Sequence, residues 1–487
     1  MRPMRNSFAL AISAIAVMFA MPGMAQDIAP LPKQADGVAQ SATLRLADVL
    51  ASSRQHAPQV LEALARVRGA QGKRLSAEGA FDTVFSADAD GRLSGYYDGR
   101  SIETKVMRPI EQLGGNVYGG YRVSGGRFPI YEDKSYTNQL GEVKAGVVLA
   151  LLRDRAIDDR RFNRTQAEAD IALADADRLF IAIGVQRRAV EAYSQWVAAG
   201  RRLVIVRDLL LLAQDRQKGL ERQVSLGLRP RIILTENQQN ILRRQTLVVQ
   251  AEQGLASAAN SLSLYWRDGD GQPLIPSPSQ LPADLPSPLP VTVDPRSAVS
   301  ARPDLRTIDL RMQVARERLQ LDRNALLPRL DFNAEASRDF GDVGFGGVSR
   351  EGTDTRIGLT FTVPLQRRTA QGRILQTQAE IDAATRRGQA LREQIVAEID
   401  TIAVAVDATA RLATLADDEQ ARAQDMAKAE RRRFEMGASD FFLVNLREES
   451  AADAELRKLD AAYRRLIAHA DLAAASADTN ALGLSPD

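Results

Sequence analysis

The sequence predicts an α+β membrane protein whose architecture is repeated within the chain. Three observations predict this fold class. Four stretches alternate apolar and polar side chains over about ten residues each, two stretches of roughly 70 residues show unbroken helical periodicity, and these elements recur in the same order in both halves. Strands of about ten residues have the length that crosses a tilted membrane barrel.

The stretch LDFNAEAS, which begins at Leu330, shows the strand alternation most clearly. Leu330 and Phe332 fall on one face of such a strand, because side chains alternate between faces with period two. Asp331, Asn333 and Glu335 fall on the other face. A soluble sheet packed on a core explains one such strand equally well. Four of them favour an apolar face toward lipid and an acidic face toward a water-filled barrel lumen.

The other strands are expected near residues 80–95 and 141–152, and around Ile357, Leu359 and Phe361. The connection between the first two strands, residues 96–139, is long and contains three glycine pairs, so it can carry extra strand or fold over the mouth of the sheet. Four strands are too few to close a barrel, and open strand edges are not tolerated in hydrocarbon. Several chains must therefore pool their strands.

Residues 155–226 and 367–436 contain no proline and show apolar positions at heptad spacing, which is typical of coiled-coil helices. A helix of roughly 70 residues is about 105 Å long at a rise of 1.5 Å per residue. Shorter helices are expected near residues 43–78 and 296–325 and after each of two glycine turns. Their lengths, added in pairs, match the long helices, which indicates helical hairpins that hang from the sheet.

The two glycine turns lie at the expected hairpin tips. Gly227 stands in VSLGLRP, where Pro230 is expected at the first position of the next helix. Gly437 stands in FEMGASD, where Ser439 or Asp440 can cap the next helix. A simple helix reversal without a binding role would give the same local pattern.

Three sequence matches in the same order indicate a duplicated unit, and a proline-rich stretch separates its copies.

The N-terminus is predicted to be a secretory signal. It has a positively charged start, an apolar run of about 13 residues and then small residues, and the apolar run is too short to span a bilayer. The expected organisation is a signal peptide at 1–25, an N-terminal extension at 26–42, a first repeat at 43–266, a linker at 267–295, a second repeat at 296–476 and a C-terminal tail at 477–487.

The composition argues against catalysis and against nucleic-acid binding. The chain has no cysteine and only two histidines, and neither histidine has a partner at metal-ligand spacing. The 64 basic and 62 acidic residues nearly cancel, so no polybasic footprint is present. We expect no enzyme activity, no cofactor, no metal and no nucleic acid. The glycine-rich GDVGFGG at residues 341–347 joins two strands and precedes no helix, so it is expected to be a surface turn.

Four features together indicate a known family: the duplicated half, the alternating strands, the two long helices and the turns SLGL and EMGA. In these features the chain resembles the TolC-like outer-membrane factor family. The resemblance implies a homotrimer in the outer membrane of a Gram-negative bacterium, with a twelve-stranded barrel built from four strands per chain and an α-helical periplasmic tunnel. It further implies a passive exit duct for a tripartite efflux pump or for type I secretion. The implied partners are a periplasmic adaptor (membrane fusion protein), an inner-membrane ABC or RND-type transporter, and outer-membrane lipid. The adaptor would dock at six residues of the tips: Leu226, Gly227, Leu228, Met436, Gly437 and Ala438.

Members of the family often carry aspartates six and nine positions after the second tip glycine, where this chain has Leu443 and Leu446. If these positions line the closed end of the tunnel, they would form an apolar constriction that excludes water. Alternatively, the register slips by a residue, so that the leucines pack between helices and Asn445 or Glu448 faces the pore. A periplasmic coiled-coil adaptor or scaffold without a barrel is the competing function, and it leaves the four strands unexplained.

Overall fold

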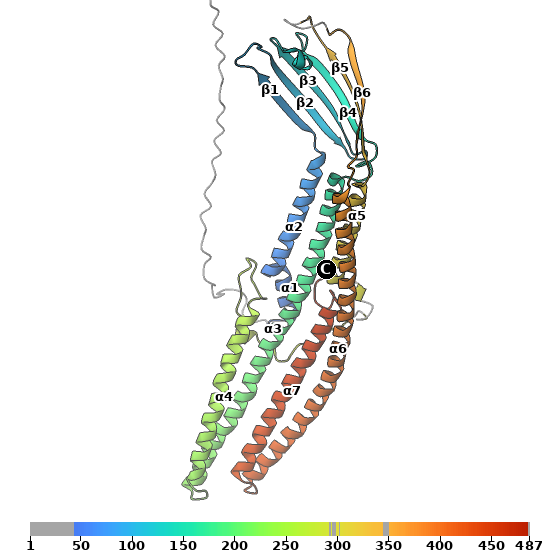
Figure 1. Ribbon diagram of the computed structural model, residues 1–487. Helices are drawn as coiled ribbons and strands as arrows, with labels where there is room; N and C mark the ends of the chain where they lie inside the picture. The colour runs from blue at the N-terminus through green and yellow to red at the C-terminus, as the bar shows by residue number, and fades with distance from the viewer. Residues whose placement is uncertain (1–42, 292–293, 295–298, 301, 344–349, 486–487) are drawn as a thin grey trace, which may run out of the picture.

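The computed structural model describes residues 43–485, apart from 292–293, 295–298, 301 and 344–349. The predicted signal peptide, the N-terminal extension and most of the GDVGFGG turn lie outside these residues. One sheet forms one end of an elongated molecule, and helices continue from it and end in two parallel hairpins (Figure 1).

Seven α-helices are described, and two of them are very long. The prediction of two long helices is confirmed, because α3 has 67 residues and α6 has 68. In Figure 1, α4 lies along the lower part of α3 and α7 along the lower part of α6, while α2 and α5 accompany the upper parts. The helices are α1 (Leu46–His56), α2 (Pro58–Glu78), α3 (Asp159–Ser225), α4 (Ile232–Leu262), α5 (Pro303–Asn324), α6 (Arg368–Glu435) and α7 (Phe441–Ala475).

Two predicted helix boundaries are wrong. The single helix expected near residues 43–78 is broken into α1 and α2, because Pro58 forces Ala57 into an extended conformation with ψ of 125°. Pro230 is not the first residue of α4, which begins at Ile232. Three short 3-10 helices are also described: η1 (Gly79–Phe81), η2 (Ile130–Ser135) and η3 (Pro278–Gln280).

The expectation of four strands per chain is wrong, because the described sheet has six. The strands follow each other in sequence order, and every neighbouring pair is antiparallel. The two additional strands form a hairpin within residues 96–139, the connection that was expected to carry extra strand or to fold over the mouth. The strands are β1 (Val84–Gly91), β2 (Arg100–Ile110), β3 (Gly115–Gly125), β4 (Glu142–Ala150), β5 (Arg329–Asp339) and β6 (Thr353–Thr362).

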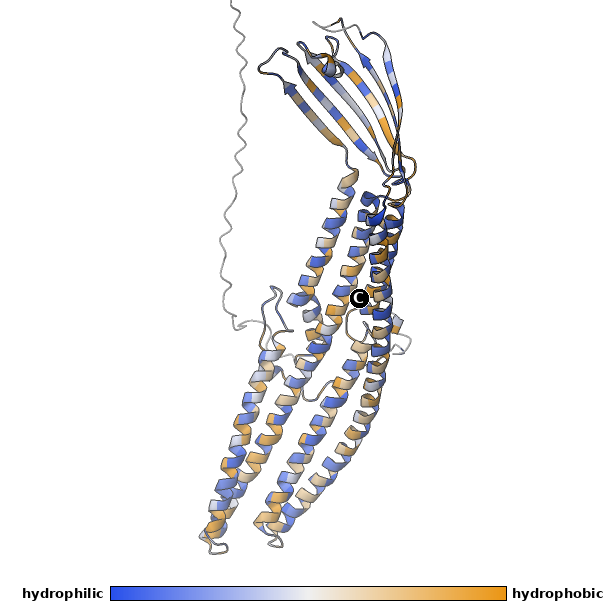
Figure 2. Cartoon of the chain, in the orientation of Figure 1, coloured by the Kyte–Doolittle hydropathy of each residue, from blue (hydrophilic) through white to orange (hydrophobic). Residues whose placement is uncertain are grey.

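The register divides the sheet into an apolar and a polar face. Phe85 of β1 lies opposite Val106 of β2, and the same row continues across the inner strands. In the two last strands, Phe332 lies opposite Leu359. The opposite face carries charged residues in several rows, among them Glu103 of β2, Lys144 of β4 and Glu335 of β5. Figure 2 shows this alternation of hydrophobic and hydrophilic residues along the strands.

The main hydrophobic core lies in the middle of the helical body, around the fully buried Trp196 of α3. Tyr193 packs against Trp196 and donates a hydrogen bond to the carbonyl oxygen of Leu44 at 2.8 Å, and burial raises the pKa of Tyr193 to about 12. Three leucines of the proline-rich segment pack on this core: Leu281, Leu285 and Leu289. Gly200 allows that approach, since a Cβ there would lie 2.3 Å from Leu281 Cδ1. Among the described residues, none of the helices combines the length and the apolar character that crossing a membrane requires.

Candidate functional site at the helix tips

Both hairpin tips end in the same glycine motif. After α3, Gly227 has φ of +75°, its N–H donates to the carbonyl oxygen of Val224 at 3.0 Å, and the N–H of Leu228 donates to that of Gln223 at 2.9 Å. This pair of bonds is the Schellman arrangement, which satisfies the last carbonyls of a helix and requires a left-handed residue.

The second tip repeats this arrangement after α6. Gly437 has φ of +77°, and the N–H groups of Gly437 and Ala438 donate to the carbonyl oxygens of Phe434 and Arg433 at 3.0 and 2.8 Å. The Asp440 carboxylate then accepts a hydrogen bond from the Leu443 N–H at 2.7 Å and caps α7. Of the two capping candidates, Asp440 is therefore the one that acts. The sequence predicted both turns correctly.

The tips carry exposed apolar side chains. Leu226, Leu228 and Met436 are each about 70% exposed, at 72, 69 and 74%. A Cβ added at Gly227 or Gly437 would have no neighbouring atom within 4 Å, so both glycines also lie in the open. The six residues proposed for docking are thus all at the surface of the isolated chain, on two turns at the same end of the molecule (Figure 1).

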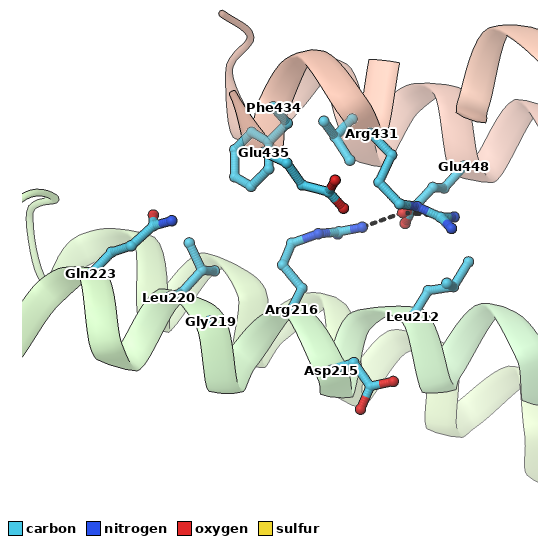
Figure 3. Close-up of a pocket in the computed structure, with 11 residues that line it drawn as sticks. Leu212, Asp215, Arg216, Gly219, Leu220, Gln223, Arg431, Phe434, Glu435 and Glu448 are labelled. Atoms are coloured by element: carbon cyan, nitrogen blue, oxygen red, sulfur yellow. Dashed lines mark hydrogen bonds and ion pairs between the residues drawn. The ribbon is translucent and has the colours of Figure 1, made fainter. Parts of the chain in front are cut away.

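Above the tips, a buried charge cluster joins the two hairpins. It consists of Glu448 on α7, Arg216 on α3, Arg244 on α4 and Arg431 on α6. The side chains of Glu448 and Arg244 are each only 1% exposed. Arg216 forms an ion pair with the Glu448 carboxylate, and Arg244 and Arg431 approach it to 3.4 Å. Figure 3 shows Arg216 and Arg431 pointing from opposite helices toward Glu448.

Three guanidinium groups surround the Glu448 carboxylate, and a second carboxylate, that of Glu449, lies 3.9 Å from Arg244. Burial lowers the pKa of Arg244, the Glu448 charge opposes that shift, and the nearby Arg216 charge adds to it. Arg244 also donates a hydrogen bond to the carbonyl oxygen of Leu209 at 2.6 Å, so two hairpin helices and α7 meet at this side chain. A cavity of about 290 Å³ lies beside Arg216 and Arg431, between α3, α6 and α7.

The residues of the proposed constriction, Leu443 and Leu446, lie five and two residues before Glu448 on α7, on the side of the tip. Leu446 is 47% exposed and Leu443 is half-buried, whereas Val444 and Glu448 face the interior between the hairpins. Asn445 accepts hydrogen bonds from Arg216 and from Asn240 of α4. In the single chain, therefore, Glu448 is buried and Asn445 is hydrogen-bonded to Arg216 and Asn240, whereas the apolar side chain of Leu446 is exposed.

The three residues proposed for the lumen lie on the charged face of the sheet. Glu335 accepts a hydrogen bond from the Tyr118 hydroxyl at 2.6 Å, across the intervening strand β4. That contact is possible because Gly146 of β4 has no side chain; a Cβ there would lie 2.5 Å from the Tyr118 ring. Asp331 pairs with Arg329 at 2.7 Å, and Asn333 lies opposite Gly358.

Comparison with known proteins bears directly on this architecture. Residues 295–478 match the family model described as outer membrane efflux protein. This part of the chain, the efflux protein domain, is therefore similar to that family. It contains α5, both strands of the second half, α6 and α7, and hence one tip, the proposed constriction and Glu448. No curated protein sequence matches the chain.

Solved structures extend the similarity from the efflux protein domain to almost the whole chain. The outer membrane protein VceC from Vibrio cholerae superposes with a TM-score of 0.61 at 16% identity, covering 90% of this chain and 96% of VceC. The open state of the Neisseria gonorrhoeae MtrE outer membrane channel gives 0.62 at 14% identity, with 92 and 94% coverage. A membrane protein from Pseudomonas aeruginosa gives 0.62 at 14%, with 93 and 99%. The fold is that of these solved outer-membrane proteins and channels.

Within the described residues, no group of three or more histidine, cysteine, aspartate or glutamate side chains is placed to hold a metal ion. The buried charge cluster is the part of the site that sequence reasoning missed, apart from Glu448 as an alternative pore residue. One signal was available: Asn237, Arg244, Ala251 and Ala258 follow each other at intervals of seven residues and are all buried, so Arg244 occupies a core position of the helix seam.

Proposed function

We propose that the efflux protein domain and the first half of the chain together form a passive exit duct in the outer membrane, which works as a homotrimer in a tripartite efflux pump or a type I secretion system. One observation carries the proposal: a sheet with an apolar and a charged face continues directly into helices of 67 and 68 residues. Such a chain combines a surface for lipid with a rod of about 100 Å, at 1.5 Å per residue.

The exposure of the apolar face supports an outer-membrane position. Phe85, Leu359 and Phe361 are 67, 66 and 62% exposed, and Ile357 is 72% exposed. Large contiguous apolar surfaces of this kind mark contact with lipid or with another protein. A periplasmic scaffold without a membrane sheet would have to cover this face with a partner, whereas hydrocarbon covers it without one.

The tips supply the second half of the proposal. The exposed residues Leu226, Leu228 and Met436 lie at the end of the molecule farthest from the sheet. With the sheet in the outer membrane, this end reaches deep into the periplasm. We assign these turns to the periplasmic adaptor, which in turn contacts an inner-membrane ABC or RND-type transporter. The transporter supplies the energy, and the duct adds no chemistry of its own.

Reconstitution tests the proposal. The mature protein is expected to fractionate with the outer membrane and, after detergent extraction, to insert into planar lipid bilayers as a water-filled pore of low resting conductance. We expect insertion because the sheet has one apolar and one charged face. We expect a low conductance because the helical end of the duct is proposed to be closed. A protein that remains soluble without detergent and gives no conductance would contradict the duct and favour the scaffold.

A further inference from the structure

Among the residues that the structure describes, no strand pairs with either edge of the sheet, β1 or β6. Every residue of β1 is exposed, and so is every residue of β6 except Gly358. Unpaired strand edges cannot remain in hydrocarbon, where each free N–H and C=O group costs several kcal/mol. Something must pair with both edges if the sheet lies in a membrane.

A second copy of the same chain fits this requirement in strand direction. The six strands alternate in direction, so β1 runs away from the helices and β6 runs toward them. Because the number of strands is even, the first strand of one copy and the last strand of another are antiparallel when both copies stand upright in the same orientation. The seam between copies therefore continues the antiparallel pattern of the sheet.

The connections to the helices fix the height of the two edge strands. Five residues separate α2, which ends at Glu78, from β1, which begins at Val84. Five residues also separate the end of β6 at Thr362 from the start of α6 at Arg368. Val84 and Thr362 are thus equivalent positions at the helical end of the sheet, and they are the natural partners at a seam.

We propose that β1 of one copy pairs with β6 of a neighbouring copy in the register that places Val84 opposite Thr362, so that three copies close an eighteen-stranded sheet. The number three rests on the proposed function, whereas the register rests on this chain's own sheet. With six strands per chain, the closed sheet has half as many strands again as the twelve that the family resemblance implies.

Side-chain chemistry supports this register on both faces. It places Phe85 opposite Phe361 on the apolar face, where Ala87 and Ala89 then meet Leu359 and Ile357. On the polar face, Asp90 meets Arg356, and opposite charges across a strand pair are favourable. A slip of one residue would bring apolar residues opposite charged ones. A slip of two residues in one direction would place Asp90 opposite Asp354, which is repulsive, and a slip of two residues in the other direction would place Asp90 opposite Gly358, which removes its pairing with Arg356.

The slant of the sheet agrees with closure in this register. If each residue is followed to its partner on the next strand, the path that starts at Val84 of β1 ends at Arg356 of β6. Arg356 lies six residues before Thr362, the proposed partner of Val84 in the next copy. The register therefore shifts by six residues over the six strands of one copy. One residue of shift per strand corresponds to a tilt of about 35°, from a rise of about 3.4 Å per residue and a spacing of about 4.8 Å between strands. Outer-membrane barrels have tilts of this size.

Cysteine cross-linking tests the seam, and the chain has no native cysteine to interfere. We choose Ser86→Cys with Thr360→Cys, because these two small polar residues meet in the proposed register. Within one chain they lie at opposite edges, roughly 24 Å apart along the sheet at about 4.8 Å per strand, so a disulfide between them must join two copies. Oxidation of the full-length protein in detergent or in membranes is expected to give a covalent ring with the mass of three chains.

Matched pairs test the register and the folding of the variants. Ser86→Cys with Gly358→Cys, and Ser86→Cys with Thr362→Cys, represent slips of two residues in either direction and are expected to cross-link at least tenfold less. Each single-cysteine variant should form a pore and no covalent oligomer larger than a dimer. Preferential cross-linking of a slipped pair would overturn the register, and a covalent ring of two or four chains would overturn the eighteen strands.

The same measurements separate the seam from the proposed function. If the variant with Ser86→Cys and Thr360→Cys forms pores but gives no cross-linked ring, the proposed pairing of β1 with β6 is wrong, and the proposed function as an exit duct is unaffected. If the wild type and all variants fail to form pores and remain soluble, the duct itself is wrong, and no membrane seam remains to be explained.

Discussion

Glu448 occupies a position where the helix seam would ordinarily carry an apolar side chain. Its neighbour on the inner face of α7, Val444, is 1% exposed and packs with Leu220 and Phe434. A buried ion cluster need not be more stable than an apolar core of the same shape, because desolvation offsets the attraction. What the cluster provides is a polar link between the α3/α4 hairpin and the α6/α7 hairpin just above the tips.

Removing one partner from such a cluster is costly. Glu448→Gln leaves Arg216 without its ion-pair partner and leaves the buried Arg244 with only the Glu449 carboxylate, 3.9 Å away, so we expect a loss of up to about 3–5 kcal/mol in the free energy of unfolding. The matched control is Glu62→Gln, whose ion pair with Arg66 is 62% exposed on both sides and contributes about 0.3–0.5 kcal/mol. Thermal unfolding midpoints in detergent compare the two. Equal shifts would show that the cluster contributes no more than a surface pair.

At the scale of single elements, each tip turn depends on one left-handed glycine. We expect Gly227→Leu combined with Gly437→Leu to reduce cargo export at least tenfold while the protein still reaches the outer membrane. An L-residue at positive φ costs roughly 1–2 kcal/mol, and a bulky side chain on each open turn blocks close approach of an adaptor. Export assays, with immunoblots of the outer-membrane fraction, measure both effects.

Gly219 on α3 is the matched control for the tip variants. It is exposed and, like the tip glycines, has no atom within 4 Å of an added Cβ, but its backbone is helical. Gly219→Leu should therefore leave export unchanged and stabilise the helix by up to about 1 kcal/mol. Undiminished export in the double tip variant would remove the tips as the docking surface.

The elements that the sequence predicted best are those governed by local rules. The long helices follow from heptad spacing without proline, and the tip turns follow from Gly227 and Gly437, because these signals act within a few residues. The break at Pro58 was missed although its cause is also local. The charge cluster could not be assembled from the sequence, because Arg216, Arg244 and Glu448 come from three helices far apart in the chain.

The strands β2 and β3 show where alternation alone was too weak a guide. Ile102 and Val106 alternate with Glu103 and Lys105, so β2 carried the signal of a membrane-length strand. Its partner β3 contains the pair Gly119-Gly120 in its middle, and glycine in a strand interior usually indicates a break or a bulge. Here Gly120 allows the close approach of both neighbouring strands, since a Cβ would lie 2.9 Å from the Thr104 carbonyl oxygen of β2 and 3.2 Å from Lys144 Cε of β4.

At the scale of the whole molecule, the two ends of the proposed duct differ greatly in width. An eighteen-stranded barrel with a tilt of about 35° has a backbone diameter of about 34 Å, against about 23 Å for twelve strands. Barrels of that strand number leave an open aqueous channel. The resistance of a duct is set by its narrowest section, so the conductance of this one should be controlled at the constriction above the tip turns and not in the sheet.

This contrast sharpens the prediction for Leu443 and Leu446. If three copies bring these leucines together near the closed end, they form an apolar ring that excludes water, and a ring without carboxylates does not bind cations. We expect Leu443→Ser with Leu446→Ser to raise the resting conductance in planar bilayers several-fold.

The control for this variant is Leu228→Ser, which makes the same chemical change on an exposed tip turn and should leave the conductance unchanged. The wild type should also show little block by divalent cations added from the periplasmic side, because the proposed ring carries no negative charge. Strong divalent block of the wild type, together with an unchanged conductance in the double serine variant, would place the constriction at charged residues and away from these leucines.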